Sequence, residues 1–424
     1  MSKKKILSTD TVLSEKYSFP SKLLGASLIG EEELKELGDV VAQKSPFRFY
    51  GEGNPCKVRE FEKNVNSYFG VKYSLAVSSG SAALFCATAA LGIGPGDEVI
   101  MPAFSWYSDF NSIALTGALP VFADIDESMN LDPEDFKRKI TSKTKAVILI
   151  HYQGGPANMD EIMTVAGKHN IKVIEDCAQA FGGQYKGKFL GTIGDIAIAS
   201  FQNNKMITCG EGGILYTNNE EYFVRAVRYH DLGFVRPAFL EQIENKELAD
   251  QSKSFIGCQF RISELQGAFI LAQFKKLPMI IAECRKKHQK IRDFISGSKN
   301  LSVRPFADGD CGITLFIKLP SKNEAKKFSK LLEESGIPVG PSSFCTNIAG
   351  NYPVSTKKMA HDSIPPFGQG FSGEKIIYNA YNDCPNTNLI AESYAAIGIG
   401  PLYTDENIDY IIKMIGKAEK TIFG

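Results

Sequence analysis

The strongest constraint on the fold is a regular alternation of short apolar runs and longer amphipathic stretches between residues 75 and 201. Each unit spans about 25 residues, a spacing typical of β-α-β units that build a parallel sheet. The continuous apolar run at 146–150 is typical of a strand buried on both faces. We therefore predict an α/β fold with a mostly parallel sheet and helices on both faces. The predicted strands are 73–77, 98–101, 121–123, 146–150, 172–174 and 196–200, and the predicted helices are 81–91, 106–116 and 159–168.

The pattern changes after Gly213. We predict helices at 219–228, 263–276 and 280–296, the last as a bridge to a second unit with strands at 312–319 and 397–399 and helices at 324–335 and 407–417. The predicted domains are an N-terminal tail and helix (1–45), a large α/β domain (46–296) and a smaller C-terminal α+β domain (297–424). Residues 340–387 are rich in Gly, Pro, Ser and Asn, so we predict loops there. Loops of this length are often functional, and we expect them to carry substrate specificity.

Charge and composition exclude several classes of protein. The chain has 48 basic and 48 acidic side chains, which argues against nucleic-acid binding through bulk positive charge. No run approaches the roughly 20 apolar residues that span a bilayer, and no apolar stretch follows the basic residues 3–5. Nine cysteines without a CxxC pair predict reduced thiols in the cytoplasm, and no residues stand at metal-ligand spacing.

Two segments end predicted strands with polar residues. In Ser78-Ser79-Gly80-Ser81, a strand ends, a glycine turn follows and a helix begins. The free amides of a helix N-terminus suit a phosphate, although a plain serine N-cap explains this segment equally simply. Asp176 ends an apolar strand at its carboxyl edge, where α/β proteins bind ligands. The carboxylate of Asp176 is equally compatible with a protonated ring nitrogen as partner and with a solvated loop or a helix cap.

Two further residues could act on a flat, electrophilic cofactor. Lys205 follows a predicted buried strand and precedes the glycine cluster 210–213. A lysine amine in apolar surroundings loses affinity for its proton, as Schiff-base chemistry requires, but most lysines lie at the surface. Trp106, the single tryptophan, follows another strand. It is placed to cover the face of a ring, or to pack in the core or an interface.

The order of these features resembles the DegT/DnrJ/StrS family of sugar aminotransferases, fold-type-I enzymes that use pyridoxal 5′-phosphate (PLP). The resemblance extends from about residue 47 to 277 and is weaker beyond. It rests on the strings SGSAAL (79–84), GDEV (96–99), VFADI (121–125), NMD (158–160), EDCAQA (175–180), GTIGD (191–195), GEGG (210–213) and FRISELQ (260–266). The family implies a seven-stranded type of sheet in the large domain.

The resemblance also implies a role for each candidate residue. Lys205 would bind PLP covalently as a Schiff base and shuttle a proton, and Asp176 would pair with the ring nitrogen. The other implied cofactor contacts are Gly80, Ser81 and Ser200 to the phosphate, Trp106 stacked on the ring, Gln179 at its phenolic edge, and Gln259 reaching the phosphate of a partner in a homodimer with shared sites. L-Glutamate or L-glutamine would convert PLP to pyridoxamine phosphate, which then aminates a keto-sugar for lipopolysaccharide or another surface polysaccharide.

Departures from the family pattern leave alternatives open. Gln259 stands where the family has Asn, and Gln202 where many members have His, a change found in members acting on inososes and octulosonate sugars. One family branch replaces the lysine by His and dehydrates sugars, so Lys205 favours transamination. A PLP-dependent dehydratase, a sugar-nucleotide-binding regulatory protein and a scaffold subunit are the alternatives. Arg48 and its basic neighbours Lys57 and Arg59 could meet an anionic sugar, or simply precede the next helix.

Overall fold

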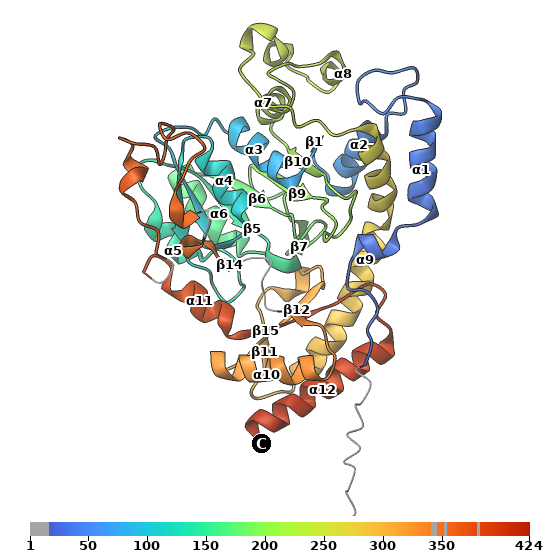
Figure 1. The fold of residues 1–424 in the computed structure, drawn as a ribbon, viewed down its shortest axis with the longest axis vertical. Helices are drawn as coiled ribbons and strands as arrows, with labels where there is room; N and C mark the ends of the chain where they lie inside the picture. Colours follow the sequence, from blue (N-terminus) through green and yellow to red (C-terminus); the bar gives the residue numbers. More distant parts are fainter. Residues whose placement is uncertain (1–16, 341–345, 352–353, 380–381) are drawn as a thin grey trace, which may run out of the picture.

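The structure is a computed structural model that describes residues 17–340, 346–351, 354–379 and 382–424. Its centre is a seven-stranded sheet in the order β1-β10-β9-β6-β5-β2-β4 (Figure 1). All its strands run parallel except β10, which is antiparallel to both neighbours. In that order the strands are Tyr73–Val77, Gly213–Thr217, Ile196–Ser200, Lys172–Asp176, Thr144–Ile150, Glu98–Pro102 and Leu119–Ala123.

Alternate side chains of this sheet enter two hydrophobic cores. In β5, Ala146 and Ile148 face one core, whereas Val147 and Leu149 face the other. Helices cover both faces, as predicted. The first core is covered by α3 (Gly80–Ala90), α4 (Tyr107–Ala114) and α7 (Glu220–His230), and the second by α2 (Lys57–Phe69), α5 (Pro133–Lys139), α6 (Met159–His169) and α9 (Glu264–Ile295).

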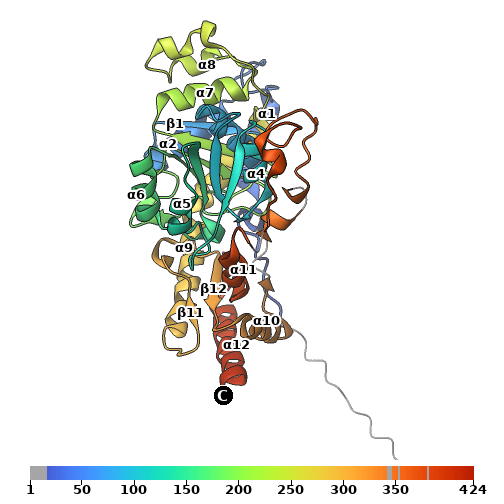
Figure 2. The same cartoon turned by 90° about the vertical axis from the view of Figure 1, so that its left-hand side faces the viewer.

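A smaller antiparallel sheet, β11-β12-β15-β13, lies below the large one in Figures 1 and 2. Its strands are Ser302–Val303, Thr314–Lys318, Tyr394–Gly398 and Val339–Gly340. Helices α10 (Lys322–Glu334) and α12 (Asp405–Phe423) pack on it around a core of their own. The domain boundaries at residues 46 and 297 stay a prediction.

Helix α9 corrects the sequence analysis, which predicted separate helices at 263–276 and 280–296. The structure has one continuous helix of 32 residues with Pro278 inside it. An internal proline lowers the stability of a helix by about 3 kcal/mol. Leu277 and Ile280, on either side of Pro278, offset this because they are fully buried in the second core of the large sheet. Farther along, Ile291 and Ile295 pack in the small core, so α9 joins the two units.

Strand β10 was missed because the glycine cluster before it resembles a loop. The described parts of 340–387 hold only short elements. Ile348, Val354 and Phe367 pack in the first core of the large sheet instead of against the small sheet. The remaining elements are α1 (Glu31–Ala42), α8 (Pro237–Leu240), α11 (Pro385–Glu392), the paired strands β3 (Phe104–Ser105) and β14 (Thr346–Asn347), the hairpin β7–β8 (Gln184–Tyr185 and Lys188–Phe189), and single 3₁₀ turns.

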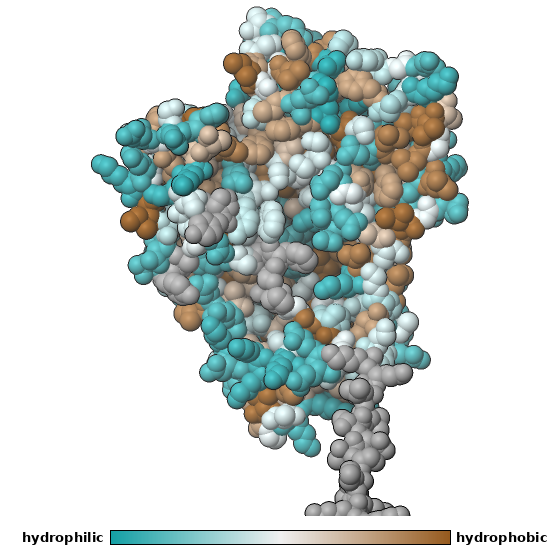
Figure 3. All heavy atoms as spheres, viewed as in Figure 1, coloured by the Kyte–Doolittle hydropathy of each residue, from teal (hydrophilic) through white to brown (hydrophobic). Residues whose placement is uncertain are grey.

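The surface of the described chain is mixed in polarity (Figure 3). Apolar atoms gather on the side of α1 in Figure 3, and Leu34 and Val41 of this helix are exposed. Among the described helices, none combines the length and apolar character needed to cross a bilayer. The described cysteines form no disulfide. The cytoplasmic location stays a prediction.

Candidate active site

A cavity of about 620 Å³ opens where the parallel strands β5, β6 and β9 end. Parallel α/β sheets bind ligands at this edge, because the loops after the strands converge there. The predicted cofactor residues that line this cavity are Gly80, Ser81, Trp106, Asp176, Gln179, Ser200 and Lys205. The structure therefore brings together seven side chains or backbone positions that the sequence spreads over more than 120 residues.

The N-terminus of α3 forms one end of the cavity. Ser79 caps this helix by accepting a hydrogen bond from the amide of Ala82 at 3.0 Å. A Cβ atom on Gly80 would lie only 2.7 Å from the Cβ atom of Ser200, so glycine is needed for this approach. The plain N-cap interpretation is thus confirmed. Anion binding stays a prediction, for which Ser81 and Ser200 lie at the same helix end and line the cavity.

Asp176 is buried at the end of β6. Its Oδ1 accepts a hydrogen bond from the amide of Ala178 at 2.7 Å. Burial raises the pKa of Asp176, while this amide and the positive charge of Lys205 act in the opposite direction. Because Asp176 is buried, the solvated-loop interpretation is wrong. A cationic partner in the cavity would stabilise its carboxylate.

Lys205 lies in the turn after β9. The backbone of this turn is held by Phe201, whose amide donates to Gly212 at 2.8 Å and whose carbonyl accepts from Cys209 at 3.1 Å. The neighbouring Met206 is buried in the second core of the large sheet. The turn is therefore anchored on both sides of Lys205, whose side chain lines the cavity.

Trp106 precedes α4 and is 53% exposed although it lines the cavity. Its ring contacts the ring of Tyr107 edge-on, at a centroid distance of 5.4 Å. The core interpretation of this tryptophan is therefore wrong, since an exposed ring face at a cavity wall is free to cover a flat ligand.

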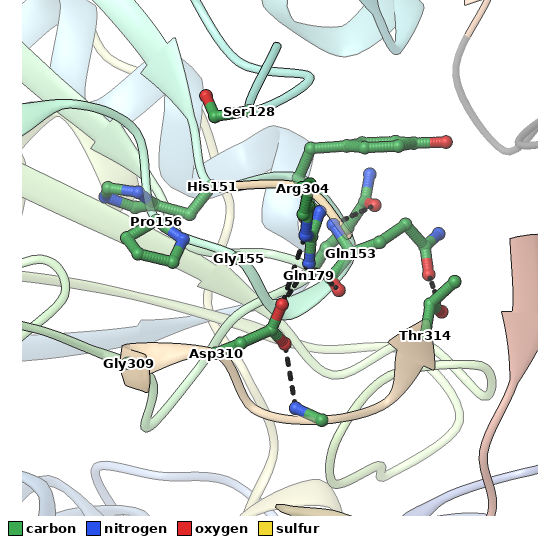
Figure 4. A network of polar contacts seen from close by, with 12 residues as sticks. Ser128, His151, Gln153, Gly155, Pro156, Gln179, Arg304, Gly309, Asp310 and Thr314 are labelled. Atoms are coloured by element: carbon green, nitrogen blue, oxygen red, sulfur yellow. Dashed lines mark hydrogen bonds and ion pairs between the residues drawn. The ribbon is translucent and has the colours of Figure 1, made fainter. Parts of the chain in front are cut away.

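Gln179 is held by a polar network that the sequence did not indicate (Figure 4). Its Oε1 accepts a hydrogen bond from the amide of Gln153 at 3.2 Å. The Oε1 of Gln153 in turn accepts from Thr314 on β12 at 2.9 Å. The small sheet is thereby connected to the predicted ring-edge contact through two hydrogen bonds.

Gln153 has left-handed backbone angles, with φ 46° and ψ 47°. For a residue other than glycine this conformation costs about 1–3 kcal/mol of free energy, so it persists only where the surroundings enforce it. Arg304 does so by donating to the carbonyls of Tyr152 and Gln153 at 2.7 and 2.9 Å, while its guanidinium pairs with the buried Asp310. Figure 4 shows Arg304 between Gln153 and Asp310. Sequence analysis had no signal for Arg304, because the two carbonyls that it binds lie about 150 residues away.

A second missed residue is Asp109, on the first turn of α4. It is fully buried, lines the same cavity as Asp176, and accepts a hydrogen bond from the hydroxyl of Ser105 at 2.6 Å. The only sequence signal was an acidic residue three positions after Trp106, which is also the usual place for a carboxylate that stabilises a helix start.

Some candidate residues lie elsewhere. Gln259 is exposed, pairs through its backbone with Asp231 and is not among the residues that line the cavity. Its role at a partner's site therefore stays a prediction. Arg48 pairs with the buried Glu62 at 2.7 Å, and Lys57 pairs with acidic side chains of α1. Arg48 and Lys57 are thus paired within the protein, which favours a structural role for them over contact with an anionic sugar.

A buried group of His151, Glu175 and Cys177 has atoms close enough to hold a metal ion. Its polar atoms already have protein partners: the ring of His151 bonds Glu175 at 2.9 Å and accepts from the amide of Ala157 at 3.1 Å. Glu175 also accepts from three backbone amides. The group is therefore explained as a structural network.

A sequence model of the DegT/DnrJ/EryC1/StrS aminotransferase family matches residues 29–360. The chain belongs to this family. Its relatives include the spore coat polysaccharide biosynthesis protein SpsC of Bacillus subtilis strain 168, which is 32% identical over 92% of this chain and 94% of SpsC. Membership confirms the predicted enzyme class, a PLP-dependent aminotransferase.

Solved structures confirm the predicted fold-type-I architecture. An aminotransferase from Psychrobacter cryohalolentis is 26% identical to this chain and superposes with a TM-score of 0.76. The match covers 96% of this chain and 100% of that aminotransferase. A GDP-4-keto-6-deoxymannose-3-dehydratase with a trapped PLP-glutamate geminal diamine is 25% identical, covers 91% of this chain and 98% of its own, and gives a TM-score of 0.73. The individual residue roles stay predictions.

Proposed function

We propose that this aminotransferase moves an amino group from L-glutamate to a keto-sugar, with PLP bound covalently to Lys205. The observation that carries the proposal is the single cavity shared by Lys205, the buried Asp176 and the glycine-serine turn at Gly80. A lysine amine, a buried acid and an anion-binding helix end in one cavity are the groups that PLP requires.

The residues present fit PLP at each of its functional groups. The amides at the start of α3 and the hydroxyls of Ser81 and Ser200 would hold the phosphate. Asp176 would pair with the ring nitrogen, and the exposed face of Trp106 would cover the ring. Gln179, fixed by the amide of Gln153, would contact the phenolic edge.

When bound, PLP supplies a conjugated ring that accepts electron density from the bond broken at the donor's Cα. The amine of Lys205 would take the proton from that carbon and return it one position away, as a general base and then a general acid. The carboxylate of Asp176 would keep the ring nitrogen protonated, because burial makes an unpaired charge there unfavourable. Neither step uses a metal.

Two relatives support a sugar as the amino acceptor. SpsC is named for polysaccharide biosynthesis, and the dehydratase is named for a GDP-linked keto-sugar and was trapped with glutamate. Within this class, Gln202 at the cavity favours the octulosonate or inosose branch, for example an 8-amino octulosonate for lipopolysaccharide. The apolar exposed side chains near α1 support the predicted homodimer.

The first test is the visible absorbance of the purified protein before and after addition of L-glutamate. We expect a band of lysine-bound PLP that glutamate converts to the pyridoxamine phosphate spectrum. Lys205→Ala should lose the band, whereas Lys22→Ala, which removes an exposed lysine of the same cavity, should keep it.

Two outcomes would decide against the proposal. A protein that binds no PLP after reconstitution is not a PLP enzyme, and the regulatory-protein alternative would then replace it. A protein that binds PLP and releases water from a keto-sugar without forming an aminated sugar is a dehydratase. Consumption of one glutamate per aminated sugar separates transamination from dehydration.

A further inference from the structure

Asp109 has one carboxylate oxygen without a donor. Its Oδ2 accepts from the hydroxyl of Ser105 at 2.6 Å, but its Oδ1 has no hydrogen-bond partner among the residues that the structure describes. The side chain is only 1% exposed, so water does not compensate for the missing partner. A buried oxygen in this state costs free energy unless it carries a proton or meets a ligand.

The carboxyl of Asp176 lines the same cavity as Asp109, and after burial its charge has the largest effect on the pKa of Asp109. Two buried carboxylates in one cavity cannot both be ionised without a large electrostatic cost. Burial, and then the charge of Asp176, raise the pKa of Asp109 well above its usual range. Lys205 is the cation that faces both acids, and His151 lies beside Asp176.

The proton belongs on Asp109 and the charge on Asp176. Asp176 accepts a hydrogen bond from the amide of Ala178 at 2.7 Å, which stabilises its ionised form. Asp109 accepts no backbone amide and only one hydroxyl. A protonated Asp109 also satisfies its own Oδ1, since that atom then donates to Asp176.

We propose that Asp109 is a positioning residue whose protonated carboxyl donates a hydrogen bond to Asp176 and holds that carboxylate toward the ring nitrogen of PLP. This inference rests on the proposed function. Asp109 does not touch the reacting carbon; it restricts the rotation of Asp176 and leaves one oxygen of Asp176 for the cofactor. The same carboxylic acid also keeps two negative charges from accumulating in a cavity that must bind a phosphate.

A purely structural role makes a different prediction. An ionised Asp109 in the first turn of α4 would stabilise the helix through its dipole. In that case Asp109→Asn would lower the melting temperature and leave cofactor chemistry unchanged. A proton on Asp109 predicts that Asp109→Asn keeps the wild-type melting temperature, because asparagine keeps the donor that Asp176 needs and carries no charge to lose.

The first experiment uses the protein without PLP, so that its result does not depend on the proposed function. An infrared difference spectrum of wild type minus Asp109→Asn at neutral pH should show the C=O stretch of a protonated carboxylic acid. Asp135→Asn is the matched control: Asp135 is buried in α5, pairs with Arg138 and is not among the cavity residues, so its difference spectrum should show a carboxylate only. A carboxylate signal for Asp109 overturns the proposal and leaves the proposed function intact.

The second experiment uses the holoenzyme. Asp109→Leu, which is branched at the same carbon but is larger and has no donor, should slow the glutamate half-reaction by about tenfold or more, as expected for loss of a hydrogen bond to a charged group. Asp109→Asn should recover the rate to within about threefold of wild type. Equal rates in the leucine and asparagine variants overturn the proposal. If the leucine variant does not fold, the infrared result decides alone, and failure of wild type to bind PLP would instead count against the proposed function.

Discussion

The cavity has two walls that are built in different ways. The cofactor wall consists of Gly80, Asp176, Ser200 and Lys205, each of which lies within a few residues of the end of a strand in the large sheet. The opposite wall comes from distant parts of the chain: Lys22 and Leu24 from the N-terminal segment, Gln153 from the loop after β5, and Ile313, Thr314 and Gly398 from the small sheet.

The difference shows what holds each wall in place. The cofactor wall is positioned by strand pairing, because neighbouring parallel strands end at the same edge. The opposite wall depends on contacts between the two units, among them the bonds of the buried Arg304 to the carbonyls of Tyr152 and Gln153. Substitutions in the two walls should therefore affect different properties: catalysis at the first, stability and sugar binding at the second.

The largest effect should come from the cofactor wall. Asp176→Ala removes the partner proposed for the ring nitrogen, and we expect the rate of the glutamate half-reaction to fall by roughly 10³-fold. Stopped-flow absorbance with saturating PLP measures the rate, and a variant with at least one tenth of the wild-type rate would contradict the assignment.

Arg304→Leu tests the opposite wall. Removing one partner of a buried ion pair costs about 3–5 kcal/mol, because Asp310 is left unpaired. We expect the free energy of unfolding in urea to fall by this amount, while the affinity for PLP changes less than the stability. The double variant Arg304→Leu with Asp310→Leu removes the unpaired charge and should recover part of the loss. An unchanged unfolding midpoint in the single variant would show that Arg304 does not join the sheets.

Acid should weaken the same wall. Burial lowers the pKa of His288 on α9 to about 4, and Asp310, Arg304 and Arg292 are the charged groups around it. The unfolded chain binds this proton near pH 6.5, so the neutral form stabilises the fold above that pH. This stability, about 3 kcal/mol, is lost as the pH falls from 6.5 toward 4.

Urea unfolding as a function of pH measures the contribution of His288. A His288→Leu variant should have a flatter profile between pH 6.5 and 4 than the wild type. His169→Gln, at an exposed histidine of α6, should keep the wild-type slope. Equal slopes in all three proteins would mean that His288 takes up its proton equally in the folded and unfolded chains.

The smallest effect should come from Thr314→Val, which removes one hydrogen bond to Gln153. We expect a loss of about 1 kcal/mol in the free energy of unfolding. Because Gln153 also holds Gln179, KM for the amino acceptor should rise more than kcat falls. If Thr314→Val lowered kcat as strongly as Asp176→Ala, the two walls would not affect different properties.

Much of the large sheet followed from the sequence. The strands at 73–77, 146–150 and 196–200 occur where the apolar runs predict them, because a strand buried on both faces has a continuous apolar pattern. The prediction missed β10 and divided α9 at Pro278. In both cases a local residue preference, for loop at glycine and for a helix end at proline, was outweighed by burial in the core.

The positions of Gly80, Asp176, Ser200 and Lys205 at or after strand ends followed from the sequence, because apolar runs and glycine turns mark those ends. How neighbouring acids differ follows instead from the packing of distant segments. Glu175 points away from the cavity, where hydrogen bonds from His151 and backbone amides hold its pKa low against burial, whereas burial raises the pKa of Asp176 beside Asp109. Two adjacent carboxylates on a strand face opposite sides, and the environment of each side is set by residues far away in the chain.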